Sequence, residues 1–224
     1  MPKKRPFQFG MRTLLIAIFV FALVTWAVLP SRRERVIREL KDLGATVTIH
    51  ERADGKGEET AVRLWAWRGE TDDLRLLFAL PPISHLLAYD CESFGDEDLA
   101  LLRNRLSGVR YLELGGTSVA DKGVNFCWEF AEVEKLTLDR TNITDSATEA
   151  FIQLPKLKEL HLEKTAITDT SIPHLAQLRG LMDLRLGGTK ISRKGYRQLR
   201  DAMPSSVSIQ TPDYGASALS NSEE

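Results

Sequence analysis

Few residues in this sequence have the types and spacings that catalysis, metal binding or cofactor binding requires. The two cysteines, Cys91 and Cys127, lack C-x-x-C spacing and are too few for a disulfide framework, so we expect them to fill the hydrophobic core. The four histidines show no H-x-x-x-H or H-E-x-x-H spacing, and there is no G-x-S-x-G motif or glycine-rich phosphate loop. We therefore predict no catalytic residue, no metal site and no cofactor.

His161 has the most suggestive neighbours, because Glu159 and Glu163 alternate with it along one predicted strand and share its exposed face. Such a group is compatible with a metal site or an acid–base pair. However, three side chains of one strand rarely converge on one ion, and the neighbouring strands add only Asp139 and Asp183. We therefore interpret the cluster as a charged surface.

The composition indicates a folded protein with almost no net charge. The 224 residues are 43% hydrophobic and 27% charged, which is a globular composition. The formal net charge of -1 provides no overall attraction to nucleic acid, so we expect no nucleic-acid partner.

Residues 13–29 are uncharged, contain eleven Leu, Ile, Val or Phe, and lie between basic flanks. As a helix this run spans about 26 Å, close to the bilayer core of about 30 Å. It predicts one transmembrane helix, over residues 13–30, that anchors the chain. A cleaved signal peptide is the alternative, although Thr25-Trp26-Ala27 is a poor cleavage site. A buried globular helix would need a groove that covers all its sides.

The orientation of this segment is not decided by the positive-inside rule. Four Lys or Arg precede it and five lie in residues 32–41. The short basic tail, residues 1–12, has no acidic residue, which favours a cytoplasmic N-terminus. We therefore expect a single-pass membrane protein whose later residues lie outside the cytoplasm.

The second half of the chain repeats every 24 residues. The segments YLELGGTSVAD, KLTLDRTNITD, ELHLEKTAITD and DLRLGGTKISR align without a break. The recurring positions are Leu112, Leu136, Leu160 and Leu184; Leu114, Leu138, Leu162 and Leu186; Thr117, Thr141, Thr165 and Thr189; and Val119, Ile143, Ile167 and Ile191. Such a period predicts a solenoid.

Each copy also indicates its own local structure. L-x-L is the period-two pattern of a strand with one buried face, and the following T-x-I turns the chain back under that strand. Thr144-Asp145 and Thr168-Asp169 then begin helices, because Ser, Thr and Asp accept hydrogen bonds from the free amides of a first helical turn.

The repeat strongly resembles the leucine-rich-repeat family in its bacterial form, L-x-x-L-x-L-x-x-T-x-I-T-D, over about residues 109–199. The resemblance implies an α/β solenoid with parallel strands on a concave face, helices on the convex face, and recognition of partners rather than catalysis. Where many members carry Asn this chain has Thr, whose hydroxyl can still bond to the turn backbone while its methyl group fills the core.

The repeats become less regular toward both ends, as terminal repeats do. Upstream, Leu86 and Ala88 occupy the leucine columns, and we place an earlier copy at VRLWAW, residues 62–67. Before it, residues 34–43 predict a helix that ends at Gly44, and residues 47–49 predict a strand that the Asp54-Gly55 turn folds back onto residues 61–64.

A last strand is expected at residues 207–209. We divide the chain into the basic tail (1–12), the transmembrane helix (13–30), an N-terminal cap of helix and strand (31–60), the leucine-rich-repeat domain (61–210) and a disordered tail (211–224).

Side chains that alternate with the leucines point to the concave face and therefore map a contact surface. Our alignment places Arg63 with His85, Trp65 with Leu87 and Trp67 with Tyr89. Exposed Trp and Tyr are where binding energy concentrates, so we predict a protein-binding site formed by Trp65, Trp67, Leu87, Tyr89 and Tyr111. The alternative is that the strand at 47–49, the loop after it or the membrane-proximal helix covers these rings.

The sequence thus predicts a non-enzymatic, membrane-tethered module that binds a protein or another envelope component. A short open sheet offers little concavity to exclude water, so no small-molecule substrate is expected. One alternative is a structural or self-assembling envelope protein, whose strand edges or aromatic end pack against another copy. Another is an enzyme with an unrecognised site. No motif names the partner.

Overall fold

The computed structural model describes residues 18–19, 31–125 and 129–210. Within these ranges no helix has both the length and the apolar character that a bilayer crossing requires. The transmembrane helix expected at residues 13–30 falls outside the described residues, apart from Ile18 and Phe19. The basic tail, Cys127 and residues 211–224 also fall outside them.

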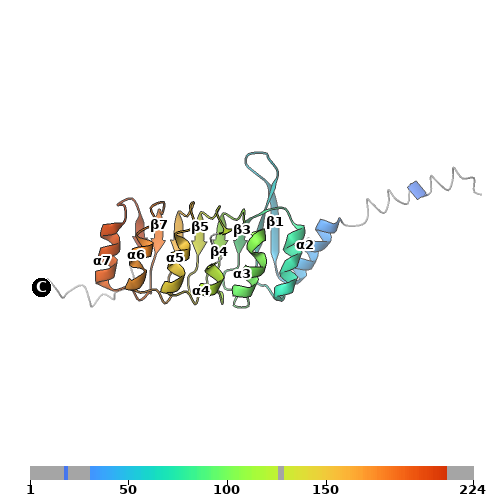
Figure 1. Cartoon of the computed structure of the whole chain (residues 1–224). Coiled ribbons are helices and arrows are strands. Elements are labelled where there is room, and N and C mark those ends of the chain that lie inside the picture. The colour runs from blue at the N-terminus through green and yellow to red at the C-terminus, as the bar shows by residue number, and fades with distance from the viewer. Residues whose placement is uncertain (1–17, 20–30, 126–128, 211–224) are drawn as a thin grey trace, which may run out of the picture.

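Eight strands form one sheet in chain order (Figure 1). The first two, β1 (Thr46–Glu51) and β2 (Glu58–Arg63), are antiparallel, whereas each later strand is parallel to the one before it. The later strands are β3 (Ile83–Leu87), β4 (Tyr111–Glu113), β5 (Lys135–Thr137), β6 (Glu159–His161), β7 (Asp183–Arg185) and β8 (Ser208–Gln210). The expected sheet of parallel strands with helices is confirmed.

Helices pack along one face of the sheet (Figure 1), and we call the opposite side the open face. They are α2 (Arg32–Asp42), η1 (Thr71–Ala79), α3 (Asp96–Leu102), η2 (Arg103–Arg105), α4 (Asp121–Val124), η4 (Asp145–Ala147), α5 (Thr148–Phe151), η5 (Asp169–Ser171), α6 (Ile172–Leu175) and α7 (Arg193–Ala202). Most are one or two turns long, because a 24-residue repeat must also hold a strand and two turns.

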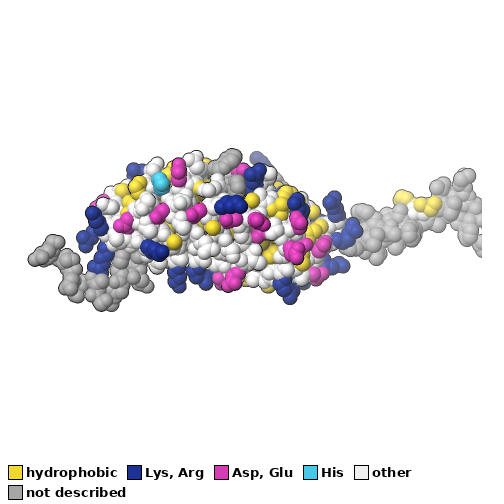
Figure 2. Space-filling view, turned by 60° about the horizontal axis from the view of Figure 1, so that its bottom comes forward, with side chains coloured by type: hydrophobic (Ala, Val, Ile, Leu, Met, Phe, Trp, Pro, Cys, Tyr) yellow, Lys and Arg dark blue, Asp and Glu magenta, His cyan; other side chains and the backbone are white. Residues whose placement is uncertain are grey.

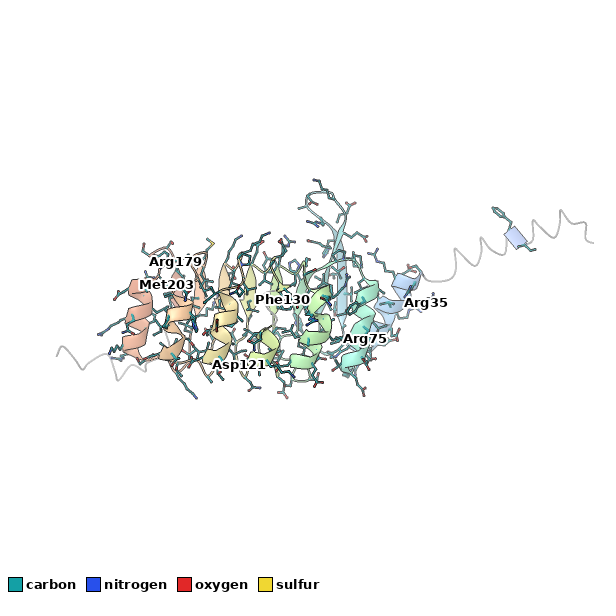
Figure 3. All side chains as sticks on the ribbon, viewed as in Figure 1. Arg35, Arg75, Asp121, Phe130, Arg179 and Met203 are labelled. Carbon is teal, nitrogen blue, oxygen red and sulfur yellow. The ribbon has the colours of Figure 1, made fainter. Side chains whose placement is uncertain are left out.

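The core lies between the sheet and the helices. Both leucine columns are fully buried, and Phe130 and Met203, which Figure 3 labels, are buried in the same cluster. Burying each such side chain contributes about 1.5–3 kcal/mol to folding. The repeated threonines behave as the sequence predicts: the hydroxyls of Thr117, Thr141 and Thr165 donate to the carbonyl oxygens three residues earlier at 2.6–2.7 Å.

The N-terminal cap consists of α2 and the β1–β2 hairpin. Helix α2 begins with a capping box, in which Ser31 Oγ accepts from the Glu34 amide and the Glu34 carboxylate accepts from the Ser31 amide. It ends before Gly44, which has φ +93° and lies so close to Ala66 that a Cβ atom there would be 1.8 Å from the Ala66 carbonyl oxygen. The predicted helix and hairpin are therefore confirmed.

The earliest repeat is shifted by two residues from our alignment. In the sheet Ala61 is opposite His85, Val62 opposite Leu86 and Arg63 opposite Leu87, so Val62 rather than Leu64 occupies the first leucine column. Strand β2 ends at Arg63, and the Trp67 amide donates to the Leu64 carbonyl to close a turn. The strand predicted to run through residues 62–67 was wrong because its second half is this turn.

Candidate partner-binding surface

Three columns of side chains follow the open face. The first holds Ala61, His85, Tyr111, Lys135, Glu159 and Asp183, and the middle one holds Arg63, Leu87, Glu113, Thr137, His161 and Arg185. The third follows directly after the strands and holds Trp65, Tyr89, Gly115, Asp139, Glu163 and Gly187. The two-residue shift of β2 therefore moves Trp65 from the middle column to the third column, one repeat before Tyr89.

The two tryptophans do not share a face. Trp65 is 63% exposed, whereas Trp67 is only 8% exposed and belongs to the hydrophobic core. The chain around Trp67 is fixed against the cap, because the Arg68 amide donates to the Leu43 carbonyl at 2.8 Å. Our assignment of Trp67 to the exposed surface was wrong, because this ring is buried in the core.

The other predicted contact residues lie on the open face. The rings of His85 and Tyr111 stack with centroids 4.5 Å apart, and Leu87 is half-buried on the same strand as His85. Burial lowers the pKa of His85, and the positive charge of Arg110 lowers it further. This stack is therefore a largely uncharged aromatic surface near neutral pH.

Tyr89 belongs to a second cluster at the edge where the strands end. The guanidinium carbon of Arg140 lies 5.0 Å from the Tyr89 ring centroid, and Arg140 donates to Asp90 Oδ1 at 2.8 Å. Tyr89 itself is 38% exposed. We call Trp65, Tyr89, Asp90 and Arg140 the rim cluster.

Glycines make room for the rim cluster. Arg140 stands two repeats after Tyr89, and the repeat between them has Gly115 and Gly116 at the corresponding positions. A Cβ atom on Gly115 would lie 2.7 Å from the Tyr89 ring, and one on Gly116 would lie 2.3 Å from Asp90 Oδ1. The absence of side chains there lets Tyr89 and Asp90 reach across to Arg140.

The backbone of this edge is strained where it carries charges. The residue after the third column has a positive φ in every regular repeat; Gly116 and Gly188 adopt it, but so do Asp90 (φ 58°), Arg140 (φ 55°) and Lys164 (φ 56°). A left-handed conformation costs a non-glycine residue roughly 1 kcal/mol. We did not predict this left-handed position from the sequence. The signal was present, because two of the repeats have glycine there, Gly116 and Gly188.

A shallow pocket lies along the same edge. Its volume is about 330 Å³. The lining residues are Tyr89, Asp90, Asp139, Arg140, Glu163 and Lys164. The face that Figure 2 shows has acidic and basic side chains interspersed, in keeping with the net charge of -1. The pocket therefore offers charges of both signs and one aromatic wall.

The three residues Glu159, His161 and Glu163 do not form one site. Glu159 lies 3.7 Å from Lys135, His161 Nε2 lies 3.3 Å from Asp183, and the Glu163 side chain lies over Gly187. Among the described residues no group of three or more His, Cys, Asp or Glu could hold a metal ion. Burial lowers the pKa of His161, and nearby Arg185 adds to this effect.

A ladder of aspartates joins successive repeats on the helix side, and here the sequence reading was incomplete. Thr144 and Thr168 cap their own helices as expected, but each Asp bonds to the next repeat. Asp145 Oδ1 accepts from the Thr168 amide at 2.8 Å, and Asp145 Oδ2 accepts from the Thr168 hydroxyl at 2.6 Å. One repeat earlier, Asp121 (labelled in Figure 3) accepts from Thr144 in the same way. One repeat later, Asp169 accepts from Ser192.

The fold and surface thus define a repeat solenoid with an open, partly aromatic sheet face. Residues 131–191, which contain β5, β6 and β7, match the family model described as "Leucine rich repeat". Leucine-rich-repeat domains are typically non-enzymatic modules for protein–protein interaction. No curated protein matches the sequence.

Two solved structures are similar in part. An internalin from Listeria monocytogenes is 17% identical, with a TM-score of 0.47, and the match covers 64% of this chain and 44% of that one. A leucine-rich-repeat protein of Leptospira interrogans is 16% identical, with a TM-score of 0.26, and the match covers 62% of this chain and 50% of that one. The chain thus spans about half of each structure.

Proposed function

We propose that the chain is a non-enzymatic module that binds a protein partner through the rim cluster and the neighbouring part of the open face. The observation that supports the proposal is the exposure of both Trp65 and Tyr89, in a domain whose other large apolar side chains are mostly buried among the described residues. Aromatic and arginine side chains are the residues in which interface binding energy concentrates. The same cluster supplies Arg140, held in position by Asp90.

The double variant Trp65→Ala with Tyr89→Ala tests this proposal. Both rings are exposed, so we expect an unchanged melting temperature together with loss of the crosslinked complex that the wild-type chain forms in the cell. The matched control is Phe78→Ala, because Phe78 is 47% exposed but lies on η1, among the helices. Equal crosslinking by the double variant and the wild type would contradict a role for the rim cluster.

The proposal includes a membrane tether at residues 13–29, with the repeats outside the cytoplasm. It rests on the uncharged, bilayer-length run between basic flanks, and only two residues separate that run from the start of α2. The full-length chain should therefore sediment with membranes, and deletion of residues 1–30 should release it. Full-length chain in the soluble fraction after lysis would contradict the tether.

Self-assembly is a second candidate, favoured by the two sheet edges. Among the described strands, β1 and β8 each have a neighbour on one side only, and an unpaired strand edge can pair with another chain. Light scattering on the full-length chain distinguishes the candidates, since a stable oligomer supports assembly and a monomer supports binding of a different protein.

A further inference from the structure

Four polar residues form a square on the open face of β5 and β6. Thr137 and His161 are opposite each other in the sheet, and Asp139 and Glu163 follow two residues later on the same side. The Glu163 amide donates to Asp139 Oδ1 at 2.7 Å, which holds the second pair together. Adjacent strands lie about 4.8 Å apart, so the four side chains are within reach of one bound group.

Two atoms of this square lack hydrogen-bond partners. Thr137 and His161 are each 5% exposed, and neither Thr137 Oγ1 nor His161 Nε2 has a hydrogen-bond partner among the described residues. The 3.3 Å approach of Asp183 to His161 does not meet hydrogen-bond geometry, and Asp183 also accepts from Arg185 at 3.0 Å. Buried polar groups are nearly always paired, so this part of the face is incomplete in the free chain.

The two carboxylates of the square also lack a direct ion pair among the described residues, although the charge of Arg185 acts on both. In the part of the chain that the structure describes, no ion pair joins Asp139 or Glu163 to a cation. Burial raises the pKa of Asp139, although the hydrogen bond from the Glu163 amide and the nearby His161 and Arg185 oppose this rise. Both carboxylates border the pocket at the edge of the sheet.

Three of the neighbouring cations are engaged with other carboxylates, and a fourth, Lys164, lines the same pocket. Lys135 lies between Glu113 and Glu159 at 3.3 and 3.7 Å, and Arg185 is paired with Asp183. Arg140 is likewise paired, with Asp90, as part of the rim cluster. The square therefore presents two carboxylates without a direct ion pair and two buried atoms without a hydrogen-bond partner.

We infer that this square receives the side chain of a lysine from a protein partner, with the ammonium beside Asp139 and Glu163 and the aliphatic stem in the pocket against Tyr89. A compact ammonium donates three hydrogen bonds and so suits acceptors arranged around a point. The Thr137 hydroxyl and the neutral His161 ring can then accept further hydrogen bonds from the ammonium. This requires the side chains that cover these two atoms to change rotamer, as interface side chains commonly do. This inference rests on the proposed function and names the chemistry of its partner.

A peptide probe tests the inference directly. Acetyl-Gly-Lys-Gly-amide, titrated into the full-length chain, should shift the NMR signals of the His161 ring and the Thr137 methyl group, and the norleucine analogue should not. The charge-neutral variant Asp139→Asn with Glu163→Gln should bind the lysine peptide about tenfold more weakly, the loss expected for about 1.4 kcal/mol. The matched control Glu159→Gln removes a carboxylate from the same strand and should bind as the wild type does. Absence of shifts, or equal weakening by Glu159→Gln, would overturn the inference.

Thr137→Val gives a second, independent result. Because the hydroxyl is buried without a partner, its replacement by a methyl group should leave the melting temperature unchanged or raise it, while weakening the lysine peptide. A lowered melting temperature would show that the hydroxyl is already satisfied, by an ordered water, and would contradict the inference.

The outcomes separate this inference from the proposed function. Loss of the partner by the double variant at Trp65 and Tyr89, with the partner kept by the double variant at Asp139 and Glu163, would contradict the lysine site and support the proposed function. If the lysine peptide binds as described but the double variant at Trp65 and Tyr89 captures its partner normally, the lysine site is supported and the role of the rim cluster is contradicted.

Discussion

Trp65 and Trp67 are separated by one residue and have opposite environments. The turn between Leu64 and Trp67 directs the Trp65 ring outward and the Trp67 ring into the core. The Trp67 indole packs so closely on Gly69 that a Cβ atom on Gly69 would lie 2.5 Å from it. A large side chain that fills a closely packed site stabilises the fold, whereas an exposed one is free to contact a partner.

This difference predicts unequal effects of truncation. Trp67→Ala should lower the free energy of unfolding by about 3–5 kcal/mol, because it leaves a cavity in the core. Trp65→Ala should change it by less than about 0.5 kcal/mol. Urea unfolding of the two variants, followed by circular dichroism, measures both values. Similar losses in the two variants would mean that Trp65 is packed as well.

His161 predicts a dependence of stability on pH. Burial lowers its pKa below 6.5, Arg185 and Lys135 lower it further, and Asp139 and Asp183 oppose them. Below about pH 6.5 the unfolded chain therefore binds more protons than the folded chain, and stability falls as the pH falls. His161→Asn should lose less stability than the wild type between about pH 7.5 and about pH 5.5. Parallel stability curves for the two proteins would contradict this assignment.

At the scale of elements, the aspartate ladder explains how such short helices stay in register. A helix of one or two turns has almost no stability of its own, so its free amides need partners from outside. Asp145 accepts from Thr168 and from the Ser171 hydroxyl, and thereby fixes the start of η5 to the preceding repeat. Although burial opposes ionisation of Asp145, these hydrogen bonds outweigh it and hold its pKa below the usual value.

Removal of one ladder residue should therefore destabilise two repeats. Asp145→Ala should cost about 2–4 kcal/mol, since it removes several hydrogen bonds to a charged acceptor and leaves donors unpaired. Asp72→Ala is the control; its salt bridge with Arg75 is exposed on η1 and should contribute less than about 0.5 kcal/mol. Thermal unfolding of the two variants gives the comparison. A loss no larger than that of the control would show that the ladder does not stabilise the stack.

At the scale of the whole molecule, the 24-residue period determines which side chains face the core. Leu160 is fully buried between the strands on either side, whereas the Glu159 side chain points outward, with its carboxylate 3.7 Å from Lys135 Nζ. Leu160→Asp should abolish cooperative unfolding, because leucine truncation alone costs about 2–5 kcal/mol and the buried carboxylate adds to it. Glu159→Ala should unfold like the wild type. Equal melting temperatures would show that the inward and outward columns are reversed.

The sequence was informative where the period holds and misleading where it does not. From Leu112 to Leu184 a constant spacing defines register, strand and buried face together, so these predictions are confirmed. The earliest copy was misaligned because LWAW has the appearance of a strand, although counting 24 residues back from Leu86 reaches Val62. Trp65 and Tyr89 of the rim cluster were predicted as contact residues, but Arg140 could not be, because it reaches over two glycines to a residue two repeats away.

Site-specific photocrosslinking tests the proposed binding surface most directly. A p-benzoylphenylalanine replaces Tyr89 or Trp65 in the full-length chain, and Phe78 on η1 is replaced as the control, because all three side chains are exposed aromatics. Irradiation of cells that produce each variant should yield the same discrete crosslinked protein from positions 65 and 89 and none from position 78. Crosslinking from position 78 with equal yield, or its absence at both 65 and 89, would contradict the assignment of partner binding to the rim cluster.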